Sequence, residues 1–600
     1  MQGSKDTTQS LLFEQLNQTS LEMMKSYLDA CQTVAKYNKI PELNWQEMFD
    51  VEHVYKYWVG EINDNKKSNI FEMQADFFKD FSDLCQSFQS MLLEEKFSPI
   101  IEPEKTDKRF RSADWHEKPF FFFLQQTYLL FVQHCLGFVE KNASHNPKIA
   151  RQISFFTRQY LDALSPTNYF FTNPDVLRAT FSTKGENLVQ GAKHFWDDIT
   201  RGKGHWSISM TDMSAFEVGK DIAITPGKVI FQNRMLQLIQ YSPTTEKVYQ
   251  KPLLIVPPWI NKFYILDMRE RNSFVKWAIE QGFTVFMISW VNPDKSYTDV
   301  SFEHYIFEGI LAALDAISQA TNEKSVNVLG FCIGGTLLAS TLAYMKAKGD
   351  KRIASATFLT TLIDFSDPGE IEVFIDENQI SALEKRMEVE GVLDGRLLMT
   401  TFNLLRANDL FWPYYINNYL CGQNPFAFDL LYWNCDSANL PRKMVSYFIR
   451  NMYMENRLTQ PGGLVVDDVR LDIENVDVPS YFLSTEQDHI APWETTFIGA
   501  QYFSGPVTFV LGGSGHIAGI VNPPANHKYA YRSAPLDVKK YVDSRAWHDN
   551  SEVHEGSWWE HWANWIKPYA GDLCSARVPG EGDLPVLQDA PGDYVKKRLL

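Results

Sequence analysis

The sequence predicts an α/β protein with a largely parallel sheet in its carboxyl-terminal part and a mostly α-helical domain before it. From about residue 216, short apolar runs alternate with amphipathic segments, which is the pattern of parallel strands joined by helical crossovers. Residues 1–215 lack such runs, and their apolar side chains recur near helical spacing. A length of 600 residues also exceeds that of one ordinary domain. We therefore expect two domains, 1–215 and 216–600.

The helical domain contains the most apolar stretch of the chain, Pro119 to Val139. On a helix, one broad stripe of this stretch carries Phe120, Leu124, Tyr128, Phe131, Cys135 and Phe138. We expect the stripe to be buried within the domain; the alternative is a face for a hydrophobic surface or a partner subunit. Glutamine and histidine residues interrupt the stretch, so we do not expect it to span a bilayer.

The second domain contains eight runs that read as strands. Between the sixth and the seventh run, residues 366–470 turn to helical and loop patterns rich in Trp, Tyr and Asn, which predicts a helical cap or lid inserted into the sheet domain. The predicted strands are Lys228–Gln232, Leu236–Tyr241, Leu253–Val256, Thr284–Trp290, Val326–Gly330, Ala356–Leu362, Ser480–Ser484 and Val507–Leu511.

Charge, cysteine usage and the N-terminal sequence argue against a nucleic-acid partner, a metal site and a secretory signal. A net charge of -17 disfavours a nucleic-acid partner, because phosphate backbones are bound by basic faces. The seven cysteines form no CxxC pair and no metal-ligand spacing, so we expect free thiols and no metal site. The polar N-terminus has no apolar signal core. We therefore expect a cytoplasmic protein without a transmembrane segment.

The sharpest motif is Gly330-Phe331-Cys332-Ile333-Gly334, placed between a predicted strand and a predicted helix. The nucleophile elbow of the α/β-hydrolase fold has the pattern G-x-S-x-G in the same context. Glycines two residues before and after the nucleophile let strand and helix approach each other. The helix N-terminus then favours a thiolate at Cys332. A buried cysteine in a glycine turn is the alternative, and the strand–turn–helix context favours the nucleophile.

A carboxylate and a histidine follow in the chain order of that fold, nucleophile, acid, histidine. Asp488 lies in the loop after strand Ser480–Ser484, and His516 lies in a glycine loop after strand Val507–Leu511. We predict that His516 is the base that activates Cys332 and that Asp488 orients it. Glu486 could replace Asp488 as the acid, and His489 could be a bystander.

Two backbone positions are candidates for the oxyanion hole. The amide of Ile333 follows the nucleophile directly, and a second amide should come from the loop after strand Leu253–Val256. That loop begins Pro257-Pro258-Trp259-Ile260, so the amides of Trp259 and Ile260 are the candidates. A Pro-Pro turn can also simply end a strand.

A cysteine at the elbow favours acyl transfer from a thioester. A thiolate exchanges readily with a thioester because the attacking and leaving sulfurs have similar pKa values. The expected intermediate is an acyl-Cys332 enzyme formed from an acyl thioester such as acyl-CoA. Some enzymes with a cysteine at the elbow hydrolyse lactones, so the residue alone does not decide the reaction.

Several separated motifs resemble those of polyhydroxyalkanoate synthases. They extend from about residue 100 to the C-terminus, and the length and the helical N-terminal region are similar to the single-subunit, short-chain class (class I). The motifs are Gly330–Thr336, Pro257–Tyr264, Ser289–Pro293 and Gly513–Gly519, with weaker echoes in Asp107–Phe110, Trp115, Phe156–Tyr160 and Gly556–Trp559.

The resemblance implies a polymerase of (R)-3-hydroxyacyl-CoA, often 3-hydroxybutyryl-CoA, that releases CoA and needs no cofactor. It implies a homodimer associated with polyester granules, which the aromatic-rich N-terminal region could contact. By the same resemblance Arg406 and His489 are candidates to hold CoA phosphates, for which Arg is well suited. For Arg406 an ion pair on the cap surface is an equal alternative. Whether His516 or Asp488 activates the 3-hydroxyl stays open.

Two other functions are compatible with the residues. A cysteine hydrolase of thioesters or lactones would use the same three side chains with water as the acceptor. A non-enzymatic granule-associated protein could retain the fold without activity, although the presence of Cys332, Asp488 and His516 in order argues against decay. Acyl chain length, the dimer interface and the role of residues 1–100 are not encoded in any motif.

Overall fold

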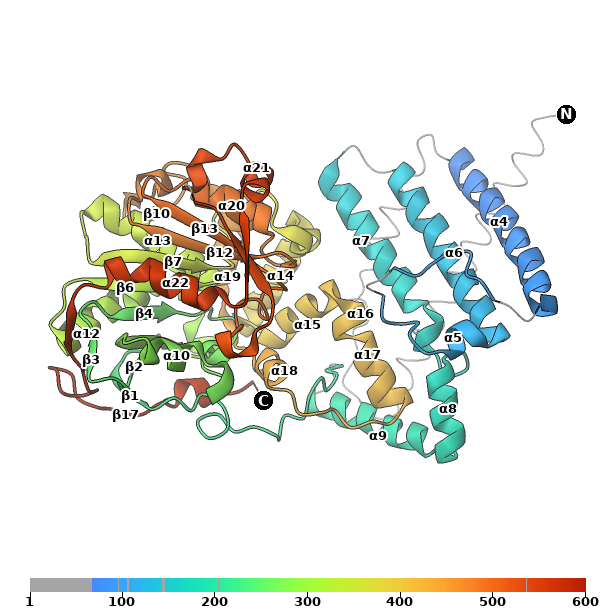
Figure 1. The fold of residues 1–600 in the computed structure, drawn as a ribbon, viewed down its shortest axis with the longest axis horizontal. Coiled ribbons are helices and arrows are strands. Elements are labelled where there is room, and N and C mark those ends of the chain that lie inside the picture. The colour runs from blue at the N-terminus through green and yellow to red at the C-terminus, as the bar shows by residue number, and fades with distance from the viewer. Residues whose placement is uncertain are drawn as a thin grey trace. The chain divides into compact units, whose positions relative to one another are not determined.

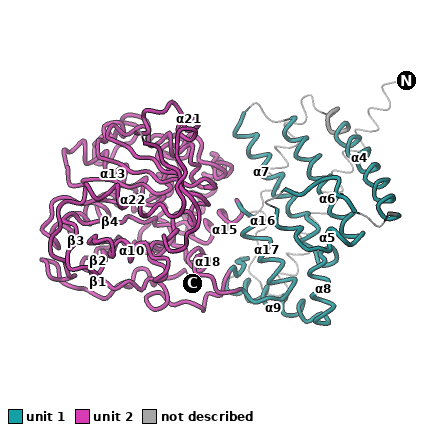
Figure 2. The backbone as a smooth tube through the Cα atoms, viewed as in Figure 1, with its two compact units in different colours: residues 1–210, 406–425 teal, residues 211–405, 426–600 magenta. Residues whose placement is uncertain are grey.

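The structure is a computed structural model that describes residues 67–94, 97–104, 107–142, 146–202, 206–535 and 537–599. Two compact units divide the chain (Figure 2): residues up to 210 with 406–425, and residues 211–405 with 426–600. The predicted domain boundary at 215 falls just after this division. The predicted cap, 366–470, is shared between the units, because the chain joins the first unit at 406 and leaves it at 425. Predictions for residues 1–66 lie outside the described residues.

The first unit is helical where it is described. Three helices begin with proline, at Pro119, Pro147 and Pro174, where the missing N–H costs nothing. Asn146 and Asn173 cap two of them by accepting backbone N–H groups of the first turn. The helices are α4 (Lys67–Glu94), α5 (Asp114–Glu117), α6 (Pro119–Lys141), α7 (Pro147–Ala163), α8 (Pro174–Thr183), α9 (Glu186–Arg201), α16 (Ala407–Leu410) and α17 (Trp412–Tyr414).

Helix α6 confirms the predicted helix and corrects part of its buried face. Tyr128 and Phe138 of the predicted stripe are buried, but Phe120 is 61% exposed, whereas Phe122 and Gln126 outside the stripe are each 1% exposed. Gln126 is buried because its side-chain oxygen accepts the backbone N–H groups of Ile100 and Ile101. Hydrophobic spacing cannot predict the burial of a polar side chain that hydrogen-bonds the backbone of an irregular segment. In the described part of the chain, no helix has the length and apolarity to cross a membrane.

The second unit is built on an eleven-stranded sheet in the order β15-β14-β13-β12-β7-β6-β4-β5-β2-β1-β17. The central strands from β5 to β13 pair in parallel, and the strands outside them pair antiparallel. The strands are β1 (Gly227–Gln232), β2 (Leu236–Tyr241), β4 (Leu253–Val256), β5 (Val285–Trp290), β6 (Val326–Phe331), β7 (Ile353–Leu359), β12 (Ser480–Thr485), β13 (Val507–Gly512), β14 (Ala530–Ser533), β15 (Glu552–Glu555) and β17 (Gln588–Asp589).

All eight predicted strands are confirmed, and one was predicted three residues too late. The prediction Ala356–Leu362 corresponds to β7, which ends at Leu359 because Thr360 adopts a φ of 42°. Strands β14 and β15 were not predicted. Their residues are half-buried or exposed and mostly polar, so they lack the apolar pattern of the central strands.

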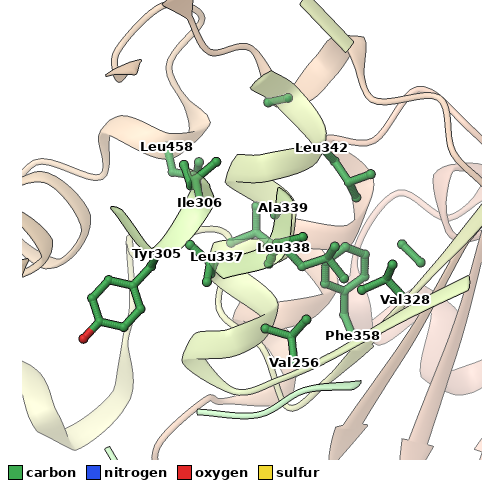
Figure 3. Close-up of a cluster of buried hydrophobic side chains, with 14 of the residues drawn as sticks. Val256, Tyr305, Ile306, Val328, Leu337, Leu338, Ala339, Leu342, Phe358 and Leu458 are labelled. Carbon is green, nitrogen blue, oxygen red and sulfur yellow. The ribbon is translucent and has the colours of Figure 1, made fainter. Parts of the chain in front are cut away.

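Helices cover both faces of the sheet (Figure 1). Alternate residues of β4 enter different cores: Leu253 and Ile255 pack with α10 (Phe274–Glu280) and α22 (Trp558–Ile566), and Leu254 and Val256 pack on the other face. That other face is covered by α12 (Ala312–Thr321), α13 (Ile333–Lys348) and α20 (Trp493–Gln501). Figure 3 shows the core beneath α13, where Leu338 lies near Val328 and Phe358 of the sheet. This packing fixes the N-terminus of α13 above the strand ends.

The segment between β7 and β12 adds no strand to the large sheet. Its described strands pair only with one another, as β8 (Val392–Leu393) with β9 (Leu440–Pro441) and β10 (Val465–Val466) with β11 (Val469–Arg470). The insertion is otherwise mainly helical, with α14 (Glu377–Glu390), α15 (Gly395–Leu405), α18 (Asp429–Asn434) and α19 (Arg442–Phe448) in the second unit. Its action as a lid stays a prediction.

Candidate active site

Cys332 occupies a strained turn between β6 and α13. Its φ of 53° and ψ of −124° lie in a region that residues other than glycine rarely adopt, and such strain gathers at functional sites. The neighbouring strand holds the turn in place. The backbone N–H of Cys332 donates to the carbonyl of Leu359 at 2.9 Å, and the hydroxyl of Thr361 donates to the carbonyl of Cys332 at 3.3 Å.

The two glycines of the motif are required by close backbone contacts. A Cβ on Gly330 would lie 2.6 Å from the Cα of Gly335, in the first turn of α13. A Cβ on Gly334 would lie 2.3 Å from the carbonyl oxygen of Val256 and 2.8 Å from that of Pro257. Strand β6, the start of α13 and the loop after β4 therefore meet at distances that only glycine allows.

His516 and Asp488 form a buried pair at the ends of β13 and β12. The Nδ1 of His516 lies 2.7 Å from the Oδ2 of Asp488, and the two side chains are 7% and 0% exposed. The other oxygen of Asp488 accepts the backbone N–H groups of Ile490 and Ala491, each at 2.9 Å. The carboxylate is thus held in one orientation, and it leaves Nε2 as the only free ring nitrogen of His516.

The loop that carries His516 is anchored by residues that sequence reasoning did not assign to the site. The indole N–H groups of Trp558 and Trp559 on α22 donate to the carbonyls of Gly519 and Ile520, each at 3.0 Å. Both indoles are 1% exposed. The tryptophan cluster near the C-terminus was the available signal, but nothing local indicated which carbonyls it would reach.

The charges around His516 favour its protonated form. Burial lowers the pKa of the imidazole, but the carboxylate of Asp488 and the sulfur of Cys332 outweigh it and raise the pKa of His516 to about 10. Because Cys332 contributes to the raised pKa of His516, its sulfur lies close to the imidazole, to which it would give its proton. The ring of Phe331 also stacks on His516, with ring centroids 5.7 Å apart. This arrangement favours the imidazolium form of His516 beside Cys332.

The loop after β4 presents free backbone N–H groups near the elbow. We call residues 257–262 the oxyanion loop. The carbonyls of Pro257, Ile260 and Lys262 accept hydrogen bonds from Trp290, Ala438 and Trp433, at 2.9, 2.8 and 2.6 Å. Within the described residues, no acceptor is found for the N–H groups of Trp259 and Ile260, nor for that of Ile333. These are the three predicted donors, and they could donate hydrogen bonds to a developing oxyanion.

The remaining predicted residues lie in different surroundings. Glu486 is exposed, and its carboxylate lies 3.9 Å from Arg532 rather than on His516. His489 is half-buried in the loop of Asp488. Arg406 is exposed, precedes α16 and belongs to the first unit, whereas the other predicted site residues belong to the second. No cluster of metal-binding side chains occurs among the residues that the structure describes.

The sheet order and the strand–turn–helix elbow define a protein of the α/β-hydrolase fold. Residues 252–523 match the family model of that fold, and residues 106–278 match the model "Poly-beta-hydroxybutyrate polymerase (PhaC) N-terminus". The chain is 47% identical over 501 residues to the poly(3-hydroxyalkanoate) polymerase of Methylorubrum extorquens, covering 83% of this chain and 82% of that one. The chain belongs to the poly(3-hydroxyalkanoate) polymerase family.

Other relatives match over a similar extent. The poly(3-hydroxyalkanoate) polymerase subunit PhaC of Rhizobium meliloti (strain 1021) is 44% identical, with 91% of this chain and 88% of the relative covered. The subunit of the same name from Cupriavidus necator is 38% identical, with 88% of each chain covered. The matches include both the helical first unit and the sheet, so the resemblance noted in the motifs extends over most of the chain.

Proposed function

We propose that this protein polymerises (R)-3-hydroxyacyl-CoA into a polyester and releases CoA, through an acyl group carried on Cys332. The observation that carries the proposal is a cysteine at the strained elbow, next to the buried His516–Asp488 pair, in a chain of the polymerase family. The pKa of His516, raised to about 10 by Asp488 and Cys332, supports a histidine that readily takes a proton from the thiol. A thiolate is the form that exchanges with thioesters.

The first half-reaction transfers the acyl group to the enzyme. Nε2 of His516 takes the proton of Cys332, and the sulfur attacks the carbonyl carbon of the acyl-CoA. The amides of Ile333 and of Trp259 or Ile260 would stabilise the oxyanion that forms. The bond between that carbon and the CoA sulfur then breaks, and the departing sulfur takes the proton from His516. Asp488 stabilises the imidazolium throughout.

The second half-reaction forms the ester bond. The 3-hydroxyl of another hydroxyacyl unit loses its proton to His516 or Asp488 and attacks the acyl–Cys332 thioester. The carbon–sulfur bond breaks, and the proton returns to Cys332. The growing product is apolar, which fits association with polyester granules. Granule association, homodimer formation and binding of CoA phosphates by Arg406 and His489 remain predictions from the family resemblance.

The test is CoA release from 3-hydroxybutyryl-CoA, with the product sized, for wild type and Cys332→Ala. We expect CoA release with insoluble polyester from the wild type and a loss of at least 10³-fold in the variant. CoA release with only free 3-hydroxybutyrate would mean that water is the acceptor and that the chain is a hydrolase. Unchanged release from Cys332→Ala would exclude the covalent mechanism.

A further inference from the structure

The last described residues of the chain lie against the oxyanion loop. We call residues 592–599 the C-terminal strap. The ammonium of Lys262, the last residue of the loop, donates to the carbonyl oxygen of Lys597 at 2.8 Å. The side-chain amide of Asn292 donates to the same oxygen at 3.0 Å. One carbonyl of the strap therefore receives two hydrogen bonds from the sheet domain.

Lys262 is a buried lysine, which is unusual for a charged side chain: it is only 4% exposed. Burial lowers its pKa, and Lys597 and Arg598 lower it further, whereas the buried carboxylate of Asp436 opposes them. A buried lysine is costly unless its hydrogen bonds are satisfied. The carbonyl of Lys597 is the acceptor that the structure provides, so Lys262 ties the loop to the strap.

The strap is in turn fixed along its length. The side-chain oxygen of Gln237 accepts the N–H groups of Asp593 and Tyr594, both at 3.1 Å, and the hydroxyl of Tyr594 donates to the carbonyl of Asn233 at 2.8 Å. At the other end, the guanidinium of Arg598 lies 4.8 Å from the ring centre of Tyr432. Anchors on both sides of Lys597 make its carbonyl a rigid point of attachment.

The strap also closes a small cavity beside the loop. Val595 is 1% exposed and lines this cavity together with Trp259, Lys262 and Ser289. The cavity has room for about one water molecule. Among the described residues, neither the indole N–H of Trp259 nor the hydroxyl of Ser289 has a hydrogen-bond partner, and both could bind that water. Removal of Val595 would expose to solvent the cavity that Trp259 lines.

We propose that the C-terminal strap is a positioning element for the oxyanion hole, with Lys262 and the carbonyl of Lys597 as the link. The loop carbonyls are held by Trp290, Ala438 and Trp433, and the strap holds the side chain at the end of the loop. Together these contacts fix the orientation of the backbone N–H groups of Trp259 and Ile260 in the oxyanion hole. The proposal rests on the proposed function for its catalytic consequence, and its structural part can be tested separately.

The test compares Lys262→Met and a chain ending at Tyr594 with wild type. Exchange of the backbone amide of Ala438, which donates to the loop carbonyl of Ile260 at 2.8 Å and so reports loop exchange, should be at least ten-fold faster in both, with the amides of α13 unchanged. The turnover number for 3-hydroxybutyryl-CoA should fall by about 10- to 100-fold with KM within two-fold, because misplaced donors affect the transition state. Alkylation of Cys332 by iodoacetamide, which does not use the oxyanion hole, should stay within two-fold.

The matched control is Lys597→Ala, which removes the side chain but keeps the carbonyl. Its exposed ion pair with Asp294 should contribute little, so exchange and turnover should equal those of wild type. Unchanged loop exchange in Lys262→Met, or faster exchange throughout the unit, would overturn the proposal, as would faster loop exchange without a fall in turnover. A wild type that releases no CoA would refute the proposed function instead, and the exchange comparison would still decide whether the strap holds the loop.

Discussion

The Nδ1 of His516 lies 2.7 Å from the Oδ2 of Asp488, and neither side chain is more than 7% exposed. The two residues are 28 positions apart in the chain and come from the ends of two neighbouring parallel strands, β12 and β13. The hydrogen bond from the backbone N–H of Gln487 to the carbonyl of Ser514, at 2.9 Å, joins the two loops. The pair is therefore held rigidly at the carboxyl ends of β12 and β13.

Asp488→Asn should lower the turnover number by about 10³- to 10⁴-fold while the fold is retained. The amide can still contact Nδ1, but it removes the charge that stabilises the imidazolium and can select the wrong tautomer. Steady-state CoA release measures the effect, and circular dichroism checks the fold.

The control for this substitution is Glu486→Gln. Glu486 is an exposed carboxylate two residues away and was the alternative acid, so its neutralisation should change turnover by less than about two-fold if Asp488 is the partner of His516. A comparable loss in Glu486→Gln, or turnover within ten-fold of wild type in Asp488→Asn, would remove Asp488 from the mechanism.

The stability that the His516–Asp488 pair adds should depend on pH. The pKa of His516 is raised from its ordinary 6.5 to about 10, so the folded state holds a proton that the unfolded state loses. The stabilisation is fully present below pH 6.5 and is lost as the pH rises towards 10. The free-energy difference in urea unfolding between wild type and Asp488→Asn should therefore shrink by on the order of 2 kcal/mol between pH 6.5 and 9.5. A difference that grows over this range would contradict the assignment.

Local patterns predicted the parts of the site that depend on chain order. Cys332 was identifiable because its glycines, its strand and its helix are contiguous, and Asp488 and His516 because each follows a buried strand. Strands of a parallel sheet end on the same edge, so residues at those ends meet whatever the distance between them in sequence.

Contacts between residues far apart in the sequence could not be predicted from local patterns. Lys262 reaches Lys597 across 335 positions, and Trp558 reaches Gly519 across 39. Neither residue is part of a periodic segment that indicates its partner. The segment 406–425 was likewise assigned to the cap, although its side chains and backbone pack with the helical unit, as where Asn187 donates to the carbonyl of Leu420 at 2.7 Å.

Gly334→Ala should destabilise the second unit by about 2–4 kcal/mol and reduce CoA release at least ten-fold. The added Cβ would lie 2.3 Å from the carbonyl oxygen of Val256, and backbone at a strand end cannot move without displacing the oxyanion loop. Urea unfolding gives the stability. Gly137→Ala in α6 is the control, because its Cβ would have no atom within 4 Å, and it should be up to about 1 kcal/mol more stable. A cost below 0.5 kcal/mol for Gly334→Ala would show that the contact can relax.

Arg109→Met should destabilise the first unit by about 3–5 kcal/mol. The guanidinium of Arg109 lies 2.9 Å from both Asp107 and Asp162 and donates to the hydroxyl of Tyr128 at 2.9 Å. Its loss leaves the buried carboxylate of Asp162 without the cation that pairs with it at hydrogen-bond distance. Arg178→Met removes an arginine that also pairs with two aspartates, but the Arg178 side chain is 59% exposed, so the cost should stay below about 1 kcal/mol. Urea unfolding followed by hydrogen exchange of α6 and α7 separates this unit from the sheet. Equal costs for the two variants would mean that burial does not set the strength of these ion pairs.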